Sequence, residues 1–103
     1  MNEPAIIVLT RNGQETAKRI CAALPEAEIF VRRGRTTGGT EFDDTGETLR
    51  NLFTNGRTII GICAAGILIR LLAPVFNSKR EEPPVLAVSE DGGIVIPLLG
   101  GHR

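Results

Sequence analysis

The segment from residue 58 to residue 76 limits the possible folds more than any other part of this sequence. Residues 58–63 form an apolar, β-branched run, residues 64–66 are small, and residues 67–76 are apolar on nearly all sides. A buried strand, a tight turn and a central helix have this pattern, and Pro74 predicts an irregular last helical turn. We therefore expect this unit to form the centre of an α/β domain.

Two further strand-like runs precede this segment. Residues 5–9 are continuously apolar, and residues 27–31 form a second short strand. Between them, residues 14–24 carry apolar side chains spaced three and four apart, which is typical of a helix that buries one face, and Pro25 ends it. A strand, a helix and a strand in this order predict a right-handed crossover between parallel strands.

A second amphipathic helix follows a long connection. Residues 32–43 contain turn residues without periodicity and are interpreted as a loop. Asp44 and Glu47 have the spacing of a helix capping box, and the helix that they begin ends at residues 55–56, which are Asn-Gly.

The sequence closes with a predicted hairpin. Residues 85–89 and 94–96 are strand-like and flank residues 90–93, Glu-Asp-Gly-Gly, which have the composition of a tight turn. Together the elements predict a single three-layer α/β domain over residues 1–103. Its sheet is expected to be mainly parallel, with about five strands, a C-terminal hairpin edge and a Rossmann-like or flavodoxin-like order. The last residues read as a turn that opens into further structure, so we expect a fragment of a longer chain.

Charge and cysteine content exclude several classes of partner. Twelve basic and twelve acidic residues cancel, so no net field attracts nucleic acid or an anionic membrane. Cys21 and Cys63 have no C-x-x-C spacing and are interpreted as reduced thiols, which favours the cytoplasm. The apolar run is broken by glycine, arginine and proline, which argues against a membrane span, and no spacing of metal ligands is present.

The turns that follow two predicted strands are the first candidates for a binding site. Ligands of open parallel sheets collect outside the carboxyl ends of the strands. One turn comprises Thr10, Arg11, Asn12 and Gly13, and the other comprises Cys63, Ala64, Ala65 and Gly66. Small residues before a helix let an anion approach its first N–H groups, but they also permit close packing of helix on strand, and both roles remain open. The patterns G-x-x-x-x-G-K and G-x-G-x-x-G are absent, which disfavours nucleotide hydrolysis.

Four arginines could recognise carboxylates. Arg70 stands alone in the apolar helix, where an internal ion pair or snorkelling is favoured over a ligand contact. Arg32, Arg33 and Arg35 could grip a polycarboxylate with bidentate hydrogen bonds, although a solvated cluster is favoured.

Three residues could exchange protons with a substrate. Glu90 and Asp91 offer carboxylates, although the turn composition around them favours a structural role. His102 is the only histidine and therefore the only side chain that ordinarily titrates near neutral pH.

Two blocks of the sequence resemble the N-terminal region of CbiG-type cobalamin biosynthesis proteins. Residues 58–74 read TIIGICAAGILIRLLAP and residues 88–102 read VSEDGGIVIPLLGGH. The resemblance extends over essentially the whole chain, and its specific motifs lie in the second half. The family often has threonine at the position of Ala65, so only backbone recognition is expected there.

The resemblance implies hydrolysis of cobalt-precorrin-5A, in which a δ-lactone is opened and acetaldehyde is released. For this chemistry the ionisable side chains of His102 and Glu90 are the candidate bases. The candidates for substrate binding are residues 10–13 and 64–66 in the two turns, together with Arg70 and Gly101. The cobalt arrives with the corrinoid substrate, and no cofactor is expected in this domain. The alternative is a non-catalytic corrinoid-binding module fused to a precorrin-3B C17-methyltransferase, whose S-adenosylmethionine would bind in the fused domain. An unrelated small-anion binding protein is a third possibility.

Overall fold

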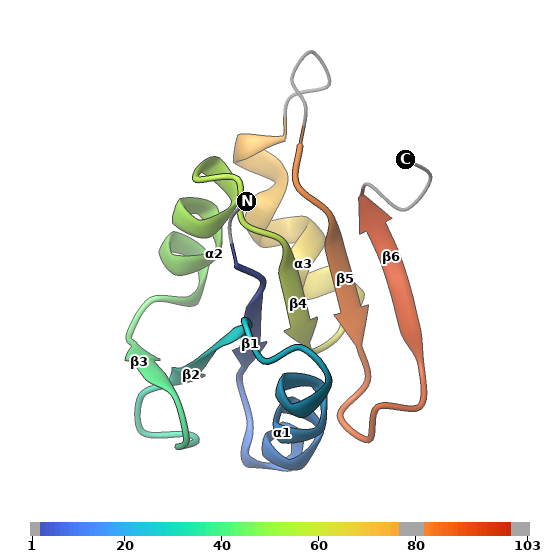
Figure 1. The fold of residues 1–103 in the computed structure, drawn as a ribbon. Helices are drawn as coiled ribbons and strands as arrows, with labels where there is room; N and C mark the ends of the chain where they lie inside the picture. The colour runs from blue at the N-terminus through green and yellow to red at the C-terminus, as the bar shows by residue number, and fades with distance from the viewer. Residues whose placement is uncertain (1–2, 77–81, 100–103) are drawn as a thin grey trace.

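The computed structural model describes residues 3–76 and 82–99, which form a six-stranded sheet between two layers of helices (Figure 1). The strands are β1 (Ala5–Val8), β2 (Glu28–Arg32), β3 (Thr40–Phe42), β4 (Ile59–Ile62), β5 (Val85–Val88) and β6 (Val95–Leu99). The helices are α1 (Gln14–Ala23), α2 (Thr45–Thr54) and α3 (Ala65–Leu72), with 3-10 turns η1 (Arg11–Gly13) and η2 (Ala73–Val75). The strand order is β3-β2-β1-β4-β5-β6, and among these strands only β6 pairs antiparallel to its neighbour. The predicted three-layer, mainly parallel α/β fold with a hairpin edge is confirmed, and the order is that of a Rossmann sheet.

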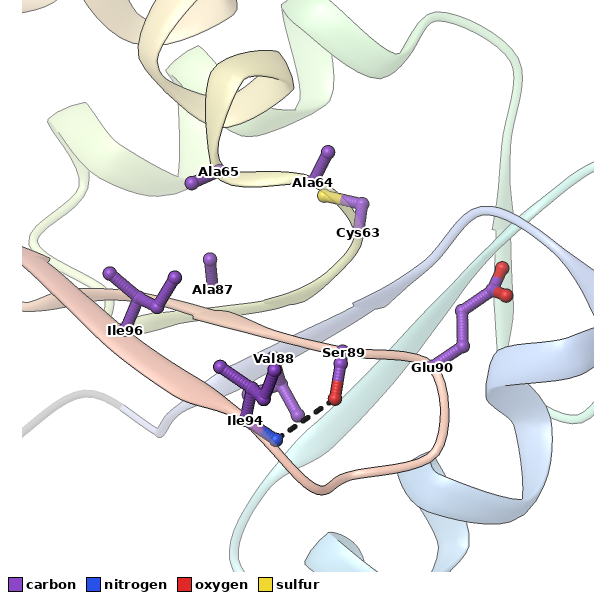
Figure 2. A pocket seen from close by; sticks show the side chains of 9 residues that line it. All are labelled: Cys63, Ala64, Ala65, Ala87, Val88, Ser89, Glu90, Ile94 and Ile96. Carbon is purple, nitrogen blue, oxygen red and sulfur yellow. Dashed lines mark hydrogen bonds between the residues drawn. The ribbon is translucent and has the colours of Figure 1, made fainter.

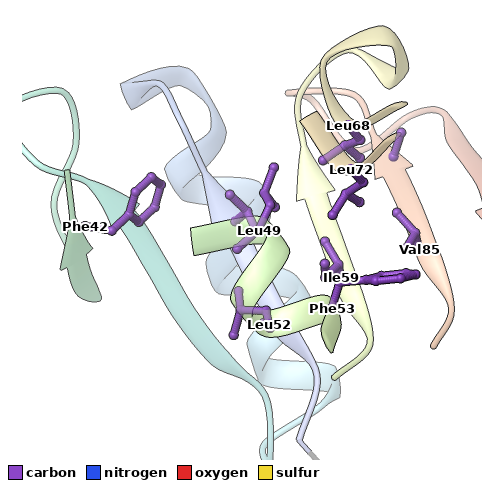
Figure 3. Close-up of a cluster of buried hydrophobic side chains, with 11 residues drawn as sticks. Phe42, Leu49, Leu52, Phe53, Ile59, Leu68, Leu72 and Val85 are labelled. Atoms are coloured by element: carbon purple, nitrogen blue, oxygen red, sulfur yellow. The ribbon is translucent and has the colours of Figure 1, made fainter. Parts of the chain in front are cut away.

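β1 is covered on both faces, as its continuous apolar sequence predicts. Ala5 and Ile7 belong to the cluster that packs under α2 and α3, part of which is drawn in Figure 3. Ile6 and Val8 point to the opposite face and pack with residues of α1. Because successive side chains of a strand alternate between faces, one fully buried strand supplies both cores.

α2 begins at the predicted capping residue. The side-chain oxygen Oδ1 of Asp44 accepts a hydrogen bond from the N–H of Glu47 at 2.9 Å, which satisfies one of the free donors of the first turn. Leu49, Leu52 and Phe53 form its buried stripe (Figure 3). The predicted helix and its cap are therefore confirmed.

α3 packs closely on β4 at a glycine of the strand. A Cβ atom on Gly61 would lie 2.8 Å from two methyl carbons of Leu68. Leu68 is fully buried, so glycine at this strand position is what lets the helix approach the sheet.

Two sequence predictions are wrong in detail. β3 lies within residues 32–43, which were predicted as a loop, and its parallel pairing with β2 gives six strands instead of about five. It is three residues long and mostly exposed, so its conformation comes from pairing and leaves little apolar signal. α3 is also not central, because only Leu68 and Leu72 are buried in it while Ile69 is 49% exposed. The irregular last turn predicted at Pro74 is confirmed by η2.

Candidate functional site

β1 and β4 end side by side at the carboxyl edge of the sheet, where Val8 pairs with Ile62 in parallel register. From this edge α1 passes to one face of the sheet and α3 to the other. Ligands of α/β sheets bind at such a switch point. Thr10 follows β1 and Cys63 follows β4, so the predicted proximity of the two turns is confirmed.

A pocket of about 280 Å³ opens at this edge between the start of α3 and the β5–β6 hairpin (Figure 2). We call it the apolar pocket, and it is lined by Cys63, Ala64, Ala65, Ala87, Val88, Ser89, Glu90, Ile94 and Ile96. In Figure 2 the side chains of Ala64 and Ala65 form one wall, and those of Ala87 and Ile96 lie opposite. Most of its surface is hydrocarbon, which suits the face of an apolar or aromatic ligand.

Glu90 is the one carboxylate among the residues that line the apolar pocket. Its Oε2 accepts a hydrogen bond from the hydroxyl of Thr10, in the turn after β1. Its main-chain oxygen accepts a second bond from the hydroxyl of Thr16, a buried residue of α1. The fold thus joins a predicted base, Glu90, to a predicted binding residue, Thr10, across the end of β4.

Asp91, the residue after Glu90, makes its side-chain hydrogen bonds within the turn. Its Oδ1 accepts hydrogen bonds from the N–H of Gly93 and from the hydroxyl of Ser89, each at 2.8 Å. These bonds, that of Gly93 first, lower the pKa of Asp91. Arg19 of α1 donates to the main-chain oxygen of Asp91 at 3.0 Å, which fastens the turn to the helix. The structural interpretation of Asp91 is therefore confirmed.

Cys63 contributes no charge to the apolar pocket. Burial raises the pKa of its thiol to about 11, so the thiol is protonated near neutral pH. A thiolate is the nucleophilic form of cysteine, and this site disfavours it.

The start of α3 has room for a ligand. Its N-cap, Ala64, has an extended backbone, and no side chain caps the first turn. A Cβ atom on Gly66 would meet no heavy atom within 4 Å, so close packing does not explain this glycine. The close contact between helix and strand occurs at Gly61 instead.

A second cavity, of about 380 Å³, lies between the start of α1 and the loop that joins β2 to β3. We call it the polar notch, and it is lined by Arg11, Gln14, Gly34, Arg35, Thr36, Thr37 and Glu41. Arg11 and Arg35 were singled out in the sequence. Gln14, Thr36 and Thr37 were missed, because no pattern in the sequence shows that the loop folds against the helix.

The second half of the chain decides which family it belongs to. Residues 47–103, 57 of the 103 residues, match the family Cobalamin synthesis G N-terminal. This chain belongs to that family. The resemblance found in the sequence motifs is thereby confirmed, and the match includes β4, α3 and the hairpin around the apolar pocket.

Comparisons with individual proteins support this family assignment. The chain is 39% identical over 99 residues to the cobalt-precorrin-5A hydrolase of Salmonella typhimurium, and 24% identical over 105 residues to that of Priestia megaterium. Each alignment covers 95% of this chain and 28% of the relative, so the chain spans little more than a quarter of these proteins. Its fold matches that of a cobalamin biosynthesis protein G homolog from Sulfolobus solfataricus, with a TM-score of 0.65 and 20% identity over 96% of this chain and 29% of that one.

Three further predicted site residues, Arg70, Asn12 and Gly13, line neither of the two cavities. Arg70 is exposed on α3 and makes no hydrogen bond or ion pair with the residues that the structure describes. Of the two favoured arrangements, the internal ion pair is therefore not found there, and the exposure agrees with snorkelling. Asn12 is exposed. Gly13 is buried and has no space for a side chain, because a Cβ atom there would lie 2.9 Å from Cγ2 of Ile62. His102 and Gly101 lie outside the described residues.

Residues 3–76 and 82–99 contain neither a candidate metal site nor a candidate membrane span. No three His, Cys, Asp or Glu side chains gather there into a possible metal site. No helix in these two ranges has the length and apolar character needed to cross a membrane. Cys21 and Cys63 are both free thiols.

Proposed function

We propose that this chain is the N-terminal domain of a cobalt-precorrin-5A hydrolase, an enzyme of cobalamin biosynthesis. The observation that carries the proposal is the 39% identity over 99 residues with the Salmonella typhimurium enzyme of that name. The substrate would be a cobalt-bearing corrinoid with many carboxylates, and the cobalt would arrive with it, so the domain would need no cofactor of its own. The remaining domains of the same polypeptide are the expected partners. The two free cysteines support a cytoplasmic location.

The proposed reaction needs a base twice. In the first step water loses a proton and bonds to the lactone carbonyl carbon, and the ring C–O bond breaks to give a carboxylate and a hydroxyl group. In the second step that hydroxyl loses its proton, the adjacent carbon–carbon bond breaks, acetaldehyde leaves, and the ring carbon takes up a proton. A positioned carboxylate or imidazole can carry these protons.

Glu90 is our candidate base among the described residues. It lines the apolar pocket, and the hydroxyl of Thr10 fixes the direction of its carboxylate. The N–H groups of Ala65 and Gly66 begin an uncapped helix beside this pocket and could stabilise the oxyanion of the lactone. His102 is the second candidate base, on the grounds of its imidazole and its place in the family motif.

Acetaldehyde release from cobalt-precorrin-5A tests the proposal. In the protein as it is encoded, Glu90→Gln keeps the size of the side chain but removes its basicity, so the rate should fall about 100-fold or more if Glu90 is the base. Glu26→Gln is the matched control, because Glu26 is exposed and precedes β2, at the opposite edge of the sheet. Normal acetaldehyde release by both Glu90→Gln and His102→Ala would exclude both base assignments. No release by the unmodified protein would exclude the function.

The alternative proposal is a corrinoid-binding module without chemistry of its own, attached to a precorrin-3B C17-methyltransferase that binds S-adenosylmethionine. It is favoured by the composition of the apolar pocket, where Glu90 is the only carboxylate among the lining residues and the thiol of Cys63 is neutral. Tight corrinoid binding without acetaldehyde release would support this alternative.

A further inference from the structure

We propose that the polar notch is a carboxylate subsite that holds an acidic side chain of the tetrapyrrole ligand while the ring lies against the neighbouring apolar pocket. This inference rests on the proposed function for the identity of the ligand. The notch itself is defined by the residues that line it, and its chemistry follows from their charges and hydrogen bonds.

The notch carries uncompensated positive charge. Glu41 lines it, but its Oε1 is paired with Nη1 of Arg33 at 3.0 Å, and Nε of the same arginine contacts Oδ1 of Asp43 at 2.6 Å. Arg11 and Arg35 make no ion pair or side-chain hydrogen bond within the described part of the chain. Two arginines without a carboxylate partner therefore line one cavity, and guanidinium is the group best suited to bidentate recognition of a carboxylate.

The loop wall of the notch is held in place by its backbone. Gly34 and Gly38 have φ values of 81° and 99°, which other residues rarely adopt. Gly39 passes so close to β2 that a Cβ atom would lie 2.4 Å from the main-chain oxygen of Ile29. The loop shape thus depends on its glycines, and it places Arg35 beside α1.

Polar side chains complete the wall between loop and helix. Nε2 of Gln14 donates to the main-chain oxygen of Thr37 at 3.0 Å and to its hydroxyl oxygen at 3.2 Å, which leaves the proton of that hydroxyl available as a donor. Thr36 is 5% exposed, and its hydroxyl has no hydrogen-bond partner among the described residues. A buried hydroxyl without a partner is unfavourable, so a conformation that turns it toward a bound oxygen would be stabilised by the ligand.

The notch and the apolar pocket are adjacent along the carboxyl edge of the sheet. Arg11 lines the notch, and the preceding residue, Thr10, donates its hydroxyl to Glu90 of the apolar pocket. A ligand with an apolar ring and acidic arms would match this pair of surfaces. A small inorganic anion would match only the notch.

The test uses uroporphyrin, a free tetrapyrrole with eight carboxylates and no lactone, titrated against the protein as it is encoded. Arg11→Gln and Arg35→Gln should each raise its Kd roughly tenfold, since a hydrogen bond to a charged group is lost. Lys18→Gln is the matched control, because Lys18 is an exposed residue of α1 that lines neither cavity. Its Kd should stay within about a factor of two of the unmodified protein, as expected for an exposed charge. Urea unfolding checks that all variants are folded.

Three outcomes would overturn the inference: no binding of uroporphyrin by the unmodified protein, equal binding by the Arg11→Gln/Arg35→Gln double variant, or full displacement of uroporphyrin by an equal concentration of inorganic phosphate. The result is independent of catalysis. Arginine-dependent binding without acetaldehyde release would keep the subsite and remove the proposed enzyme. Acetaldehyde release with arginine-independent binding would remove the subsite alone.

Discussion

The apolar pocket and the polar notch lie at the same edge of one sheet and differ in almost every other respect. The first has about 280 Å³, lies on the β4–β5 side and is walled mainly by alanine, valine and isoleucine. The second has about 380 Å³, lies on the β1–β2 side and is walled mainly by arginine, threonine and glutamine. A Rossmann-type edge supplies both positions, so the residues that follow each strand decide which chemistry each cavity supports.

The two cavities also depend on different supports. α3 forms a wall of the apolar pocket and reaches β4 through Gly61, whereas the polar notch depends on the start of α1 and on a glycine-rich loop. If this division is real, damage to one support should leave the other cavity working. The following predictions test it by the free energy of unfolding, in decreasing order of effect.

Leu68→Ala should have the largest effect. Leu68 of α3 is fully buried and packs against Gly61 of β4. Its replacement removes contacts and leaves a cavity, so the free energy of unfolding should fall by about 2–5 kcal/mol, measured by urea denaturation. Ile69→Ala on the same helix is the control, because Ile69 is 49% exposed, and its effect should be about 0.5 kcal/mol or less. The folded Leu68→Ala protein should retain arginine-dependent binding at the notch. Loss of that binding would show that the cavities are not independent.

Gly39→Ala should disturb the loop that forms one wall of the polar notch. The new Cβ would lie 2.4 Å from the oxygen of Ile29, so the loop must move, at a cost of about 1–3 kcal/mol in the free energy of unfolding. Gly34→Ala separates crowding from backbone strain, since a Cβ there meets nothing within 4 Å but the φ of 81° is unfavourable by about 1 kcal/mol. Equal effects of the two substitutions would argue against the tight contact at Gly39.

The pH dependence of stability should report the apolar surroundings of Cys63. Burial raises its pKa from 9.0 to about 11, so the folded state keeps a proton that the unfolded state loses as the pH rises above 9. The stabilisation is therefore complete below pH 9 and is lost toward pH 11, with a change of about 1 kcal/mol between pH 9 and pH 10. Urea denaturation at both pH values should show this difference in the unmodified protein and a smaller one in Cys63→Ala. Identical slopes would mean that the thiol is not desolvated.

The difference between the cavities also explains what could be predicted from the sequence. The strands and helices around the apolar pocket carry strong apolar patterns, so β4, β5 and the hairpin were predicted, and so were two small lining residues, Ala64 and Ala65. The notch depends on β3 and on hydrogen bonds between Gln14 and Thr37, which are 23 residues apart and leave no periodic signal. Contacts of this kind form only after the chain has folded, and they were missed.

The exposure of α3 was mispredicted for a related physical reason. An all-round apolar helix is normally buried, but only Leu68 and Leu72 are buried here, and Ile69 faces away from the sheet. Apolar composition therefore predicted the contact of α3 with β4 correctly and its depth in the domain incorrectly. The family resemblance added what the composition lacked, because its motifs lie on both walls of the apolar pocket.

Gly66→Ala should have the smallest effect, and the opposite sign. Gly66 is exposed in the first turn of α3, and a Cβ there meets no atom within 4 Å, so alanine should raise the free energy of unfolding by about 0.5–1 kcal/mol through its higher helix propensity. Gly61→Ala is the comparison, and it should be destabilising because its Cβ would lie 2.8 Å from Leu68. Urea denaturation of both variants measures the contrast. A stabilised Gly66→Ala protein with weaker corrinoid binding would show that the ligand approaches the helix backbone there. A destabilised one would show that the packing of α3 differs from that described.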